Sequence, residues 1–255
     1  KGKPCACIVT AGAGSANAIT GVISAWADSI PGIIISGQEK LTAIKSFEGM
    51  RMWGVQGFDS TLMVKKITKY STRIIKPSDI TYQLNKAYDI SIDNRPGPVW
   101  VDVPLDIQGS FLNKNEVKKY KKTKIKKKFL SISTVKELEK IIKKSKRPVF
   151  WFGNGIKLSQ SQNLIPKLLK KIPIPFFLSW SAIDLINSNH KLNFGRPGVY
   201  GNRASNLILQ SSDLIIAIGT RMSIPMIGYV HNEFARQAKI VSVDVDSKEI
   251  KKLKK

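Results

Sequence analysis

The sequence has few of the residue types that build disulfide or metal scaffolds. Of 255 residues, two are cysteines and two are histidines. Cys5 and Cys7 stand two apart in a strand-like segment, and neither His190 nor His231 is spaced to join them at a metal ion. We therefore expect both cysteines to be small buried side chains in a reducing compartment, and we expect no metal ligands in this chain.

Long hydrophobic runs are also lacking. The longest apolar stretches are of strand length, such as residues 33–35 and 214–218, whereas a membrane span needs about 20 apolar residues. No signal peptide precedes the first strand-like segment, and the chain opens without an initiator methionine. We expect a cytoplasmic protein with no membrane partner, and a chain that is a fragment of a longer one.

Arginine is scarce although the chain is strongly basic. The net charge is +24, with 34 lysines but only eight arginines. Proteins that recognise bases or phosphates favour arginine, because its planar side chain donates two hydrogen bonds at once. Nine of the lysines fall in residues 111–128 and five in residues 248–255. This distribution favours a solvated surface and no nucleic-acid partner. The alternative, a nucleic-acid binder that uses residues 111–128, predicts duplex DNA binding that falls steeply with salt.

Hydrophobic residues make up 42% of the chain and alternate between strand and helix patterns. Strands are predicted at residues 6–10, 32–36, 63–75, 98–103, 148–152, 174–178, 214–218 and 240–245. Helices are predicted at residues 15–27, 77–92, 133–144, 159–171, 202–211 and 247–253. Continuous apolar strands between helices indicate parallel sheets covered on both faces. The predicted fold class is α/β, with two doubly wound parallel-sheet domains.

Local signals place the limits of these elements. Residues 37–62 form a long polar connection, and the strand at 6–10 is predicted to be buried. Ser78 and Asp79 are expected to cap the helix at 77–92, and Ser133 is expected to open the helix at 133–144. The lysine-rich residues 111–129 are predicted to be an exposed linker between domains at residues 1–110 and 130–255.

Small or polar turns follow several strands. Gly12 and Gly14 lie between a strand and a helix, where the helix N-terminus offers unpaired N–H groups to a ligand. A dinucleotide-binding motif would have a third glycine where Asn17 stands and an acid near Glu39. An NAD-dependent oxidoreductase that uses Gly12, Gly14 and Glu39 is therefore one alternative, and tight helix–strand packing explains the glycines equally well.

Three further turns point to a second crevice at the carboxyl ends of parallel strands, where such sheets bind ligands. Their residues are Gly153, Gly155, Gly219, Arg221, Asp244 and Asp246. Arginine can pair with phosphate, and a strand-end aspartate can accept from a ribose hydroxyl or an adenine amine. Asp246 is equally well explained as the cap of the helix that follows it.

Together these segments carry a resemblance that no single motif does. In its first half, the sequence resembles the pyrimidine-binding domain of acetolactate synthases and related thiamine-diphosphate-dependent enzymes. The matching segments are 9–21 (Val-Thr-Ala-Gly-Ala-Gly-Ser-Ala-Asn-Ala-Ile-Thr-Gly), 28–31 (Asp-Ser-Ile-Pro), 36–38 (Ser-Gly-Gln), 54–56 (Gly-Val-Gln), 67–69 (Ile-Thr-Lys) and 95–104 (Arg-Pro-Gly-Pro-Val-Trp-Val-Asp-Val-Pro). The second half resembles the Rossmann-like central domain of that family at 153–155, 198–200, 212–214, 219–221 and 243–250.

The resemblance implies a parent enzyme that decarboxylates a 2-oxo acid and joins the remainder to an acceptor, with thiamine diphosphate and Mg²⁺. It implies a homodimer or tetramer with the site between chains. It places Gly12, Ala13, Gly14, Asn17 and Gln56 beside the pyrimidine, and Gln56 and Lys69 near the substrate. Ala13 stands where proline is more usual.

The same resemblance implies what this chain lacks. The catalytic glutamate of the family belongs before Lys1, so no catalytic residue is expected here, and neither Glu39 nor Glu48 fills that role. The domain that holds the diphosphate through the metal ion is expected to be absent too, so the chain alone is expected to be inactive.

The central domain carries a second cofactor question. In acetolactate synthases it binds FAD, at positions that correspond to Gly153, Gly155, Gly219, Arg221, Asp244 and Asp246. Residues 222–226 depart from the acidic pattern of flavin-binding members. The sequence therefore leaves open whether this domain binds FAD. Residues 55–58 and Trp100 favour relatives of specialised, sugar-type pathways, which include lyases, hydrolases and decarboxylases. A non-catalytic ADP- or FAD-binding protein is the alternative of another class.

Overall fold

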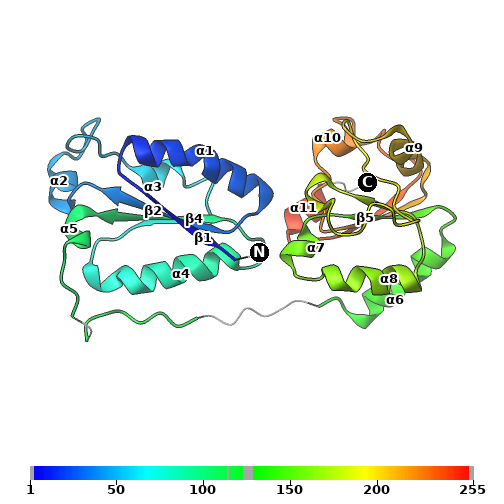
Figure 1. The fold of residues 1–255 in the computed structure, drawn as a ribbon, viewed down its shortest axis with the longest axis horizontal. Coiled ribbons are helices and arrows are strands. Elements are labelled where there is room, and N and C mark those ends of the chain that lie inside the picture. Colours follow the sequence, from blue (N-terminus) through cyan, green and yellow to red (C-terminus); the bar gives the residue numbers. More distant parts are fainter. Residues whose placement is uncertain (1–2, 114, 123–128, 253–255) are drawn as a thin grey trace. The chain divides into compact units, whose positions relative to one another are not determined.

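The computed structural model of the chain describes residues 3–113, 115–122 and 129–252 (Figure 1). The chain divides into two compact units, residues 1–126 and residues 127–255. The division falls within the lysine-rich residues 111–129. Residue 114 and residues 123–128 of that stretch, like Leu253 of the predicted closing helix, lie outside the described residues.

A four-stranded parallel sheet with strand order β1-β2-β4-β3 forms the centre of the first unit. Its strands are β1 (Cys5–Val9), β2 (Gly32–Gln38), β3 (Tyr70–Arg73) and β4 (Pro98–Pro104). Its helices are α1 (Ala13–Asp28), α2 (Leu41–Ser46), α3 (Ser60–Met63), the 3-10 turn η1 (Pro77–Asp79), α4 (Ile80–Ile92) and α5 (Leu105–Gln108). The helices α1 and α4 lie on opposite faces of the sheet (Figure 1).

The central strand β4 supplies both hydrophobic cores of this unit, because every one of its residues is buried. Trp100 packs with Val22 of α1 on one face. Val99 and Val101 pack with Ala87 of α4 on the other. Successive side chains of a strand point to opposite faces, so one strand can contribute side chains to the cores on both faces of the sheet. The prediction of a parallel sheet covered on both faces is confirmed for this unit.

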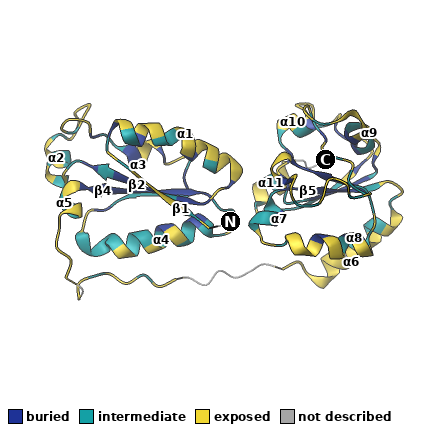
Figure 2. Cartoon of the chain, in the orientation of Figure 1, coloured by how far each residue is buried: buried dark blue, intermediate teal, exposed yellow. Residues whose placement is uncertain are grey.

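The prediction that β1 is buried is wrong. Cys5 and Cys7 are both exposed, and 79% of Ile8 is accessible to solvent. Among the described strands, β1 pairs only with β2 and forms the edge of the sheet. Figure 2 shows the strand as exposed along most of its length. Composition alone cannot tell an edge strand from a central one.

The segment between β2 and α4 also differs from its prediction. The connection predicted for residues 37–62 contains the short helices α2 and α3, and the strand predicted for 63–75 is confined to Tyr70–Arg73. Val64 ends α3, and Thr68 donates a hydrogen bond to its carbonyl oxygen over 2.9 Å. The helix predicted from Pro77 begins as a 3-10 turn, and neither Ser78 nor Asp79 caps α4 with its side chain.

The second unit contains a parallel sheet with strand order β6-β5-β7-β8. Its strands are β5 (Pro148–Phe152), β6 (Phe176–Leu178), β7 (Leu214–Ile218) and β8 (Lys239–Val243). Its helices and 3-10 turns are α6 (Ile132–Lys144), α7 (Gly155–Leu158), η2 (Gln162–Leu164), α8 (Ile165–Lys171), η3 (Trp180–Ala182), α9 (Arg203–Ser211), α10 (Ile224–Ile227) and α11 (Ser247–Lys251).

Aromatic side chains of β5 and β6 pack into the hydrophobic cores on both faces of the second sheet. Phe150 packs with Leu169 of α8 on one face, and Trp151 packs with Leu209 of α9 on the other. The helix predicted for 159–171 is divided into η2 and α8 after a left-handed Gln160. Two parallel α/β sheets are thus confirmed as the fold class.

The described part of the lysine-rich stretch lies along α4. The backbone N–H of Lys118 donates to the carbonyl oxygen of Ser78 over 2.9 Å. Lys122 Nζ lies 2.9 Å from Asp89 Oδ1, and hydrogen bonding to this carboxylate raises the pKa of Lys122. These residues stay largely exposed, and they are attached to the first unit.

Candidate functional site

A glycine turn follows β1 at the carboxyl edge of the first sheet. Gly12 has a left-handed φ of 69° and stands just before α1. A Cβ atom at this position would lie 2.7 Å from both the Cβ and the carbonyl oxygen of Gln56. Only glycine fits there without displacing its neighbour. The structure thus brings Gly12 and Gln56 together across 44 positions of sequence.

The rest of the turn divides into packed and exposed positions. A Cβ atom on Gly14 would lie 2.7 Å from Thr10 Cγ2, and Ser15 donates a hydrogen bond to the Thr10 carbonyl oxygen over 2.8 Å. Ala13 and Asn17 are exposed. Gly14 therefore serves helix–strand packing, whereas Ala13 and Asn17 face solvent at the start of α1. That helix begins with no acidic residue in its first turn and no capping side chain.

Gln56 lies on a tight loop that we call the Gln56 loop (residues 53–59). The N–H of Trp53 donates to the Gly57 carbonyl oxygen over 2.7 Å, and the N–H of Gly57 donates to the Trp53 carbonyl oxygen over 2.9 Å. Gly57 has no room for a side chain, because a Cβ atom there would lie 2.5 Å from Glu39 Cγ. Glu39 therefore packs under the loop, and Gln56 is held at its exposed surface.

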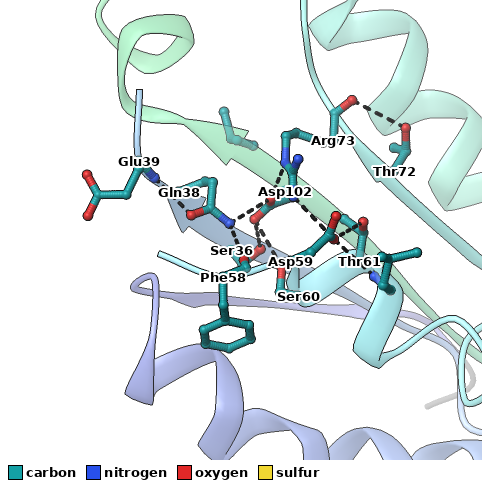
Figure 3. A network of polar contacts seen from close by, with 12 residues as sticks. Ser36, Gln38, Glu39, Phe58, Asp59, Ser60, Thr61, Thr72, Arg73 and Asp102 are labelled. Carbon is teal, nitrogen blue, oxygen red and sulfur yellow. Dashed lines mark hydrogen bonds and ion pairs between the residues drawn. The ribbon is translucent and has the colours of Figure 1, made fainter. Parts of the chain in front are cut away.

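A buried carboxylate anchors the sheet beneath this loop (Figure 3). Asp102 of β4 is fully buried. It accepts hydrogen bonds from Ser36 Oγ at 2.6 Å, Gln38 Nε2 at 3.1 Å, Ser60 Oγ at 3.3 Å and Arg73 Nε at 2.9 Å. A buried charge is stable only when it is paired and hydrogen-bonded. These four donors meet that requirement.

The network extends to the Gln56 loop itself. Gln38 Nε2 also donates to the carbonyl oxygen of Phe58 over 2.9 Å. Burial raises the pKa of the Asp59 carboxyl, but hydrogen bonds from Thr61 and Leu62 and the charge of Arg73 outweigh it, so the pKa lies below its ordinary value. The second end of the loop is thus fixed by an ionised carboxylate.

Lys69 lies at the opposite edge of the sheet. It precedes β3, and its N–H donates to the carbonyl oxygen of Pro98, where β4 begins. Its Nζ donates to the Asp93 carbonyl oxygen over 2.5 Å. Burial lowers the pKa of the Lys69 ammonium, and the charge of Asp93 opposes part of that effect. Within this chain the structure does not bring Lys69 together with Gly12 and Gln56.

The glycines of the second unit pack against one another. A Cβ atom on Gly153 would lie 2.1 Å from the Gly219 carbonyl oxygen, and one on Gly155 would lie 2.7 Å from Gly219 Cα. Gly219 has a left-handed φ of 61°. The three glycines are therefore accounted for by the close approach of two loops that follow β5 and β7.

Arg221 borders an open cavity of about 500 Å³ beside these loops. The other lining residues are Met222, Ser223, Ile224, Pro225, Ile227, His231, Glu249 and Lys252. Asp244 and Asp246 do not line it. Asp246 caps α11 by accepting from the Lys248 N–H over 2.9 Å, and Asp244 accepts from the Asp246 N–H over 2.9 Å. The structure thus shows the capping role that was one of two explanations for Asp246.

The residues that the structure describes contain neither a metal-binding cluster nor a membrane span. Among them, no group of three or more His, Cys, Asp and Glu side chains could hold a metal ion. Within the same residues, no helix has the length and apolar character needed to cross a bilayer.

Sequence reasoning missed the residues that support the Gln56 loop. Ser36, Gln38, Arg73 and Asp102 were not predicted as a site, although Ser36, Gln38 and Asp102 fall within the matching segments. One signal could have found them. An aspartate in an otherwise apolar, buried strand requires donors on neighbouring strands, and Ser36 and Gln38 stand on β2 next to it.

Segments of both units match the sequences of known protein families. Residues 135–255 match the family described as "Thiamine pyrophosphate enzyme, central domain". Residues 1–63 match "Thiamine pyrophosphate enzyme, N-terminal TPP binding domain".

Several curated proteins are similar over nearly the whole chain. The acetolactate synthase isozyme 1 large subunit of Escherichia coli (strain K12) is 30% identical over 255 residues, which cover 99% of this chain and 43% of that protein. The acetolactate synthase large subunit of Corynebacterium glutamicum is 31% identical, over 99% of this chain and 40% of that protein. The probable acetolactate synthase large subunit of Methanococcus aeolicus is 33% identical, over 98% of this chain and 41% of that protein. The chain spans less than half the length of these relatives.

Proposed function

The chain belongs to the thiamine pyrophosphate enzymes, and from this we propose that the full-length protein performs acetolactate synthase-like chemistry. In that chemistry a 2-oxo acid is decarboxylated and the remaining fragment is joined to an acceptor carbonyl. The similarity to large subunits named acetolactate synthase supports the proposal. The structural observation that supports it is the contact of Gly12 with Gln56, two of the residues proposed for the pyrimidine site.

The residues of the turn fit a flat polar ring. Gly12 is buried under Gln56 at the strand end, and the side chains of Ala13, Asn17 and Gln56 are exposed. Asparagine and glutamine amides both donate and accept, as an aminopyrimidine requires of its neighbours. We propose Gly12, Ala13, Asn17 and Gln56 as its contacts, with Gly14 supporting the turn from behind.

Thiamine diphosphate, when bound, supplies a nucleophilic carbon for addition to the 2-oxo acid carbonyl. In this chain, the uncapped N-terminus of α1 favours electron-rich groups through its N–H donors and its dipole. Gln56, which packs against Gly12, carries an amide that can donate to an oxygen of a bound ligand. We assign these residues to binding and orientation, and we propose no catalytic residue among them.

The acids of the connection do not qualify as the family's catalytic glutamate. Glu39 packs against Gly57, within 2.5 Å of where a Cβ atom would stand. Glu48 is exposed after α2. We propose that the glutamate that promotes the reaction belongs to sequence outside these residues, together with the Mg²⁺ ligands.

The second unit fits FAD only in part. The cavity of about 500 Å³ bordered by Arg221 can admit part of a nucleotide. The glycines at 153, 155 and 219, however, pack on one another and form no open cradle, and Asp244 and Asp246 lie outside the cavity lining. We therefore propose an FAD or ADP moiety only at Arg221, and flavin absorbance of the purified full-length protein tests it. We also propose the dimer or tetramer, which sedimentation of that protein tests.

Cofactor binding by the full-length protein tests the pyrimidine site directly. Replacing Gln56 with leucine removes the amide at nearly constant volume. We expect the half-saturating concentration of thiamine diphosphate, measured with excess Mg²⁺, to rise about tenfold, because one hydrogen bond is lost.

Glu48→Gln is the matched control. It alters another exposed side chain of the same connection, and its half-saturating concentration should equal that of the unaltered protein. Equal cofactor affinity in Gln56→Leu and Glu48→Gln would contradict the assignment of Gln56.

A further inference from the structure

Arg73 connects the sheet to both ends of the Gln56 loop. It is the last residue of β3, next to β4 in the sheet. Its Nε donates to Asp102 Oδ2 over 2.9 Å, and one terminal nitrogen lies 3.2 Å from Asp59 Oδ1 as an ion pair. Its guanidinium carbon lies 4.7 Å above the ring centroid of Trp53. One side chain therefore contacts the first and the last residue of the loop.

These contacts are of the kinds that restrict motion. The planar guanidinium can donate to a carboxylate and stack on an indole ring at the same time, which a lysine ammonium cannot. Its side chain is only 17% exposed, and that of Asp102 is 0% exposed. Figure 3 shows Arg73 directed between Asp102 and Asp59. Removing it would leave a buried carboxylate short of a donor and both ends of the loop without this contact.

Among the residues that the structure describes, none holds the Gln56 side chain through a hydrogen bond or an ion pair. It faces solvent at the tip, and its main chain packs against Gly12. The position of Gln56 relative to the Gly12 turn is therefore set by how the ends of the loop are held. Gln38 holds the loop at Phe58, and Arg73 holds it at Trp53 and Asp59.

We propose that Arg73 is a positioning residue of the thiamine diphosphate site, acting with Asp102 to hold the Gln56 loop against the Gly12 turn. Arg73 touches neither Gly12 nor Gln56, so its effect passes through Trp53 and Asp59. The proposal rests on the proposed function, because it takes Gln56 to contact the cofactor.

Amide hydrogen exchange and cofactor binding, measured on the full-length protein, test the proposal. Arg73→Met removes the charge and every donor. The double variant Arg73→Met with Asp102→Asn also removes the buried charge that would otherwise be left unpaired, and neutral replacements of buried pairs are often tolerated. We expect both to exchange the Trp53 and Gly57 amides about tenfold faster or more, with unchanged protection of the β4 core.

A second readout separates positioning from structural support. We expect the half-saturating concentration of thiamine diphosphate to rise about tenfold in the folded double variant, which a merely structural residue would not cause. Lys86→Met is the matched control, since Lys86 Nζ lies 4.6 Å above the ring of Tyr70, away from the loop. It should change neither readout.

The outcomes distinguish this proposal from the proposed function. Unchanged loop exchange or unchanged cofactor affinity in a folded double variant overturns the role of Arg73 and leaves the proposed function standing. A full-length protein that does not respond to thiamine diphosphate overturns the proposed function and the cofactor role of Arg73 with it. Should neither Arg73 variant fold, Asp59→Asn removes the charge that pairs with Arg73 and keeps an amide oxygen for the Thr61 and Leu62 donors. It must show the same two changes, at smaller size, or the proposal fails.

Discussion

At residue 12 the backbone and the packing make separate demands for glycine. The φ of 69° is a conformation that side chains disfavour, and the space for a Cβ atom is filled by Gln56. Gly21, in the middle of α1, differs in both respects. It is exposed, it has ordinary helical geometry, and a Cβ atom there would meet nothing within 4 Å.

These two positions give opposite predictions for the same substitution. We expect Gly12→Ala to lower the free energy of unfolding by about 2 kcal/mol or more, because it combines left-handed strain with a clash. Gly21→Ala should raise that free energy by about 0.5–1 kcal/mol, because alanine favours a helix interior. Urea denaturation of both variants measures the difference. A neutral Gly12→Ala would show that the turn tolerates a side chain.

The residues of the site could be predicted singly but not as a group. Gly12 follows from a local glycine motif, whereas Ala13, Asn17 and Gln56 follow from the family resemblance, and the structure brings Gln56 against Gly12. The pairing of Arg73 with Asp102 could not be predicted, because it joins β3 to β4 through 29 positions of sequence. Lys69 lies at the other end of the sheet within this chain, and its place near the substrate stays a prediction. A motif shows the order of residues along the chain but not which end of a strand they occupy.

At the scale of elements, α6 illustrates how a helix start is selected. The sequence offers Ser131, Ser133 and Thr134 within four positions, and Ser133 was predicted to open the helix. In the structure Ser131 is the cap, because its Oγ accepts from the Thr134 N–H over 3.1 Å. Ser133 lies inside the first turn and contacts Ser131 Oγ at 2.8 Å.

Substitution of each serine tests this assignment. We expect Ser131→Ala to destabilise the chain by about 1 kcal/mol, the usual effect of losing a cap. Ser133→Ala should change stability by less than about 0.5 kcal/mol, because it lies on the surface. Thermal unfolding of the two variants side by side measures this. A larger loss from Ser133→Ala would return the helix start to the position predicted from sequence.

Strands were predictable wherever they are central. Residues 148–152 and 214–218 coincide with β5 and β7, whose hydrophobic runs are buried on both faces. The prediction of a strand over 63–75 is wrong because its buried residues belong to two elements. Val64 lies at the end of the short helix α3, and Ile74 lies just after the strand β3. Alternating hydrophobicity cannot separate these cases. The exposure of β1 likewise depends on its edge position, which is set by sheet order.

At the scale of the whole molecule, the excess of lysine has a partly structural role. The net charge is +24, yet Lys118 and Lys122 lie in ion pairs with Asp79 and Asp89 of the first unit. Tyr120 packs edge-on to Tyr82 between them, with ring centroids 5.6 Å apart. Exposed ion pairs contribute little each, so we interpret residues 118–122 as a solvated segment attached along α4.

The central claim is that these two units belong to an enzyme that depends on thiamine diphosphate. The most direct measurement is carbon dioxide release from 2-oxo acids, pyruvate first, by the full-length protein after removal of its cofactors. The account predicts no release from the stripped protein and restored release when thiamine diphosphate and Mg²⁺ are added together. Release that is the same with and without thiamine diphosphate, or no release from any 2-oxo acid in its presence, would contradict it.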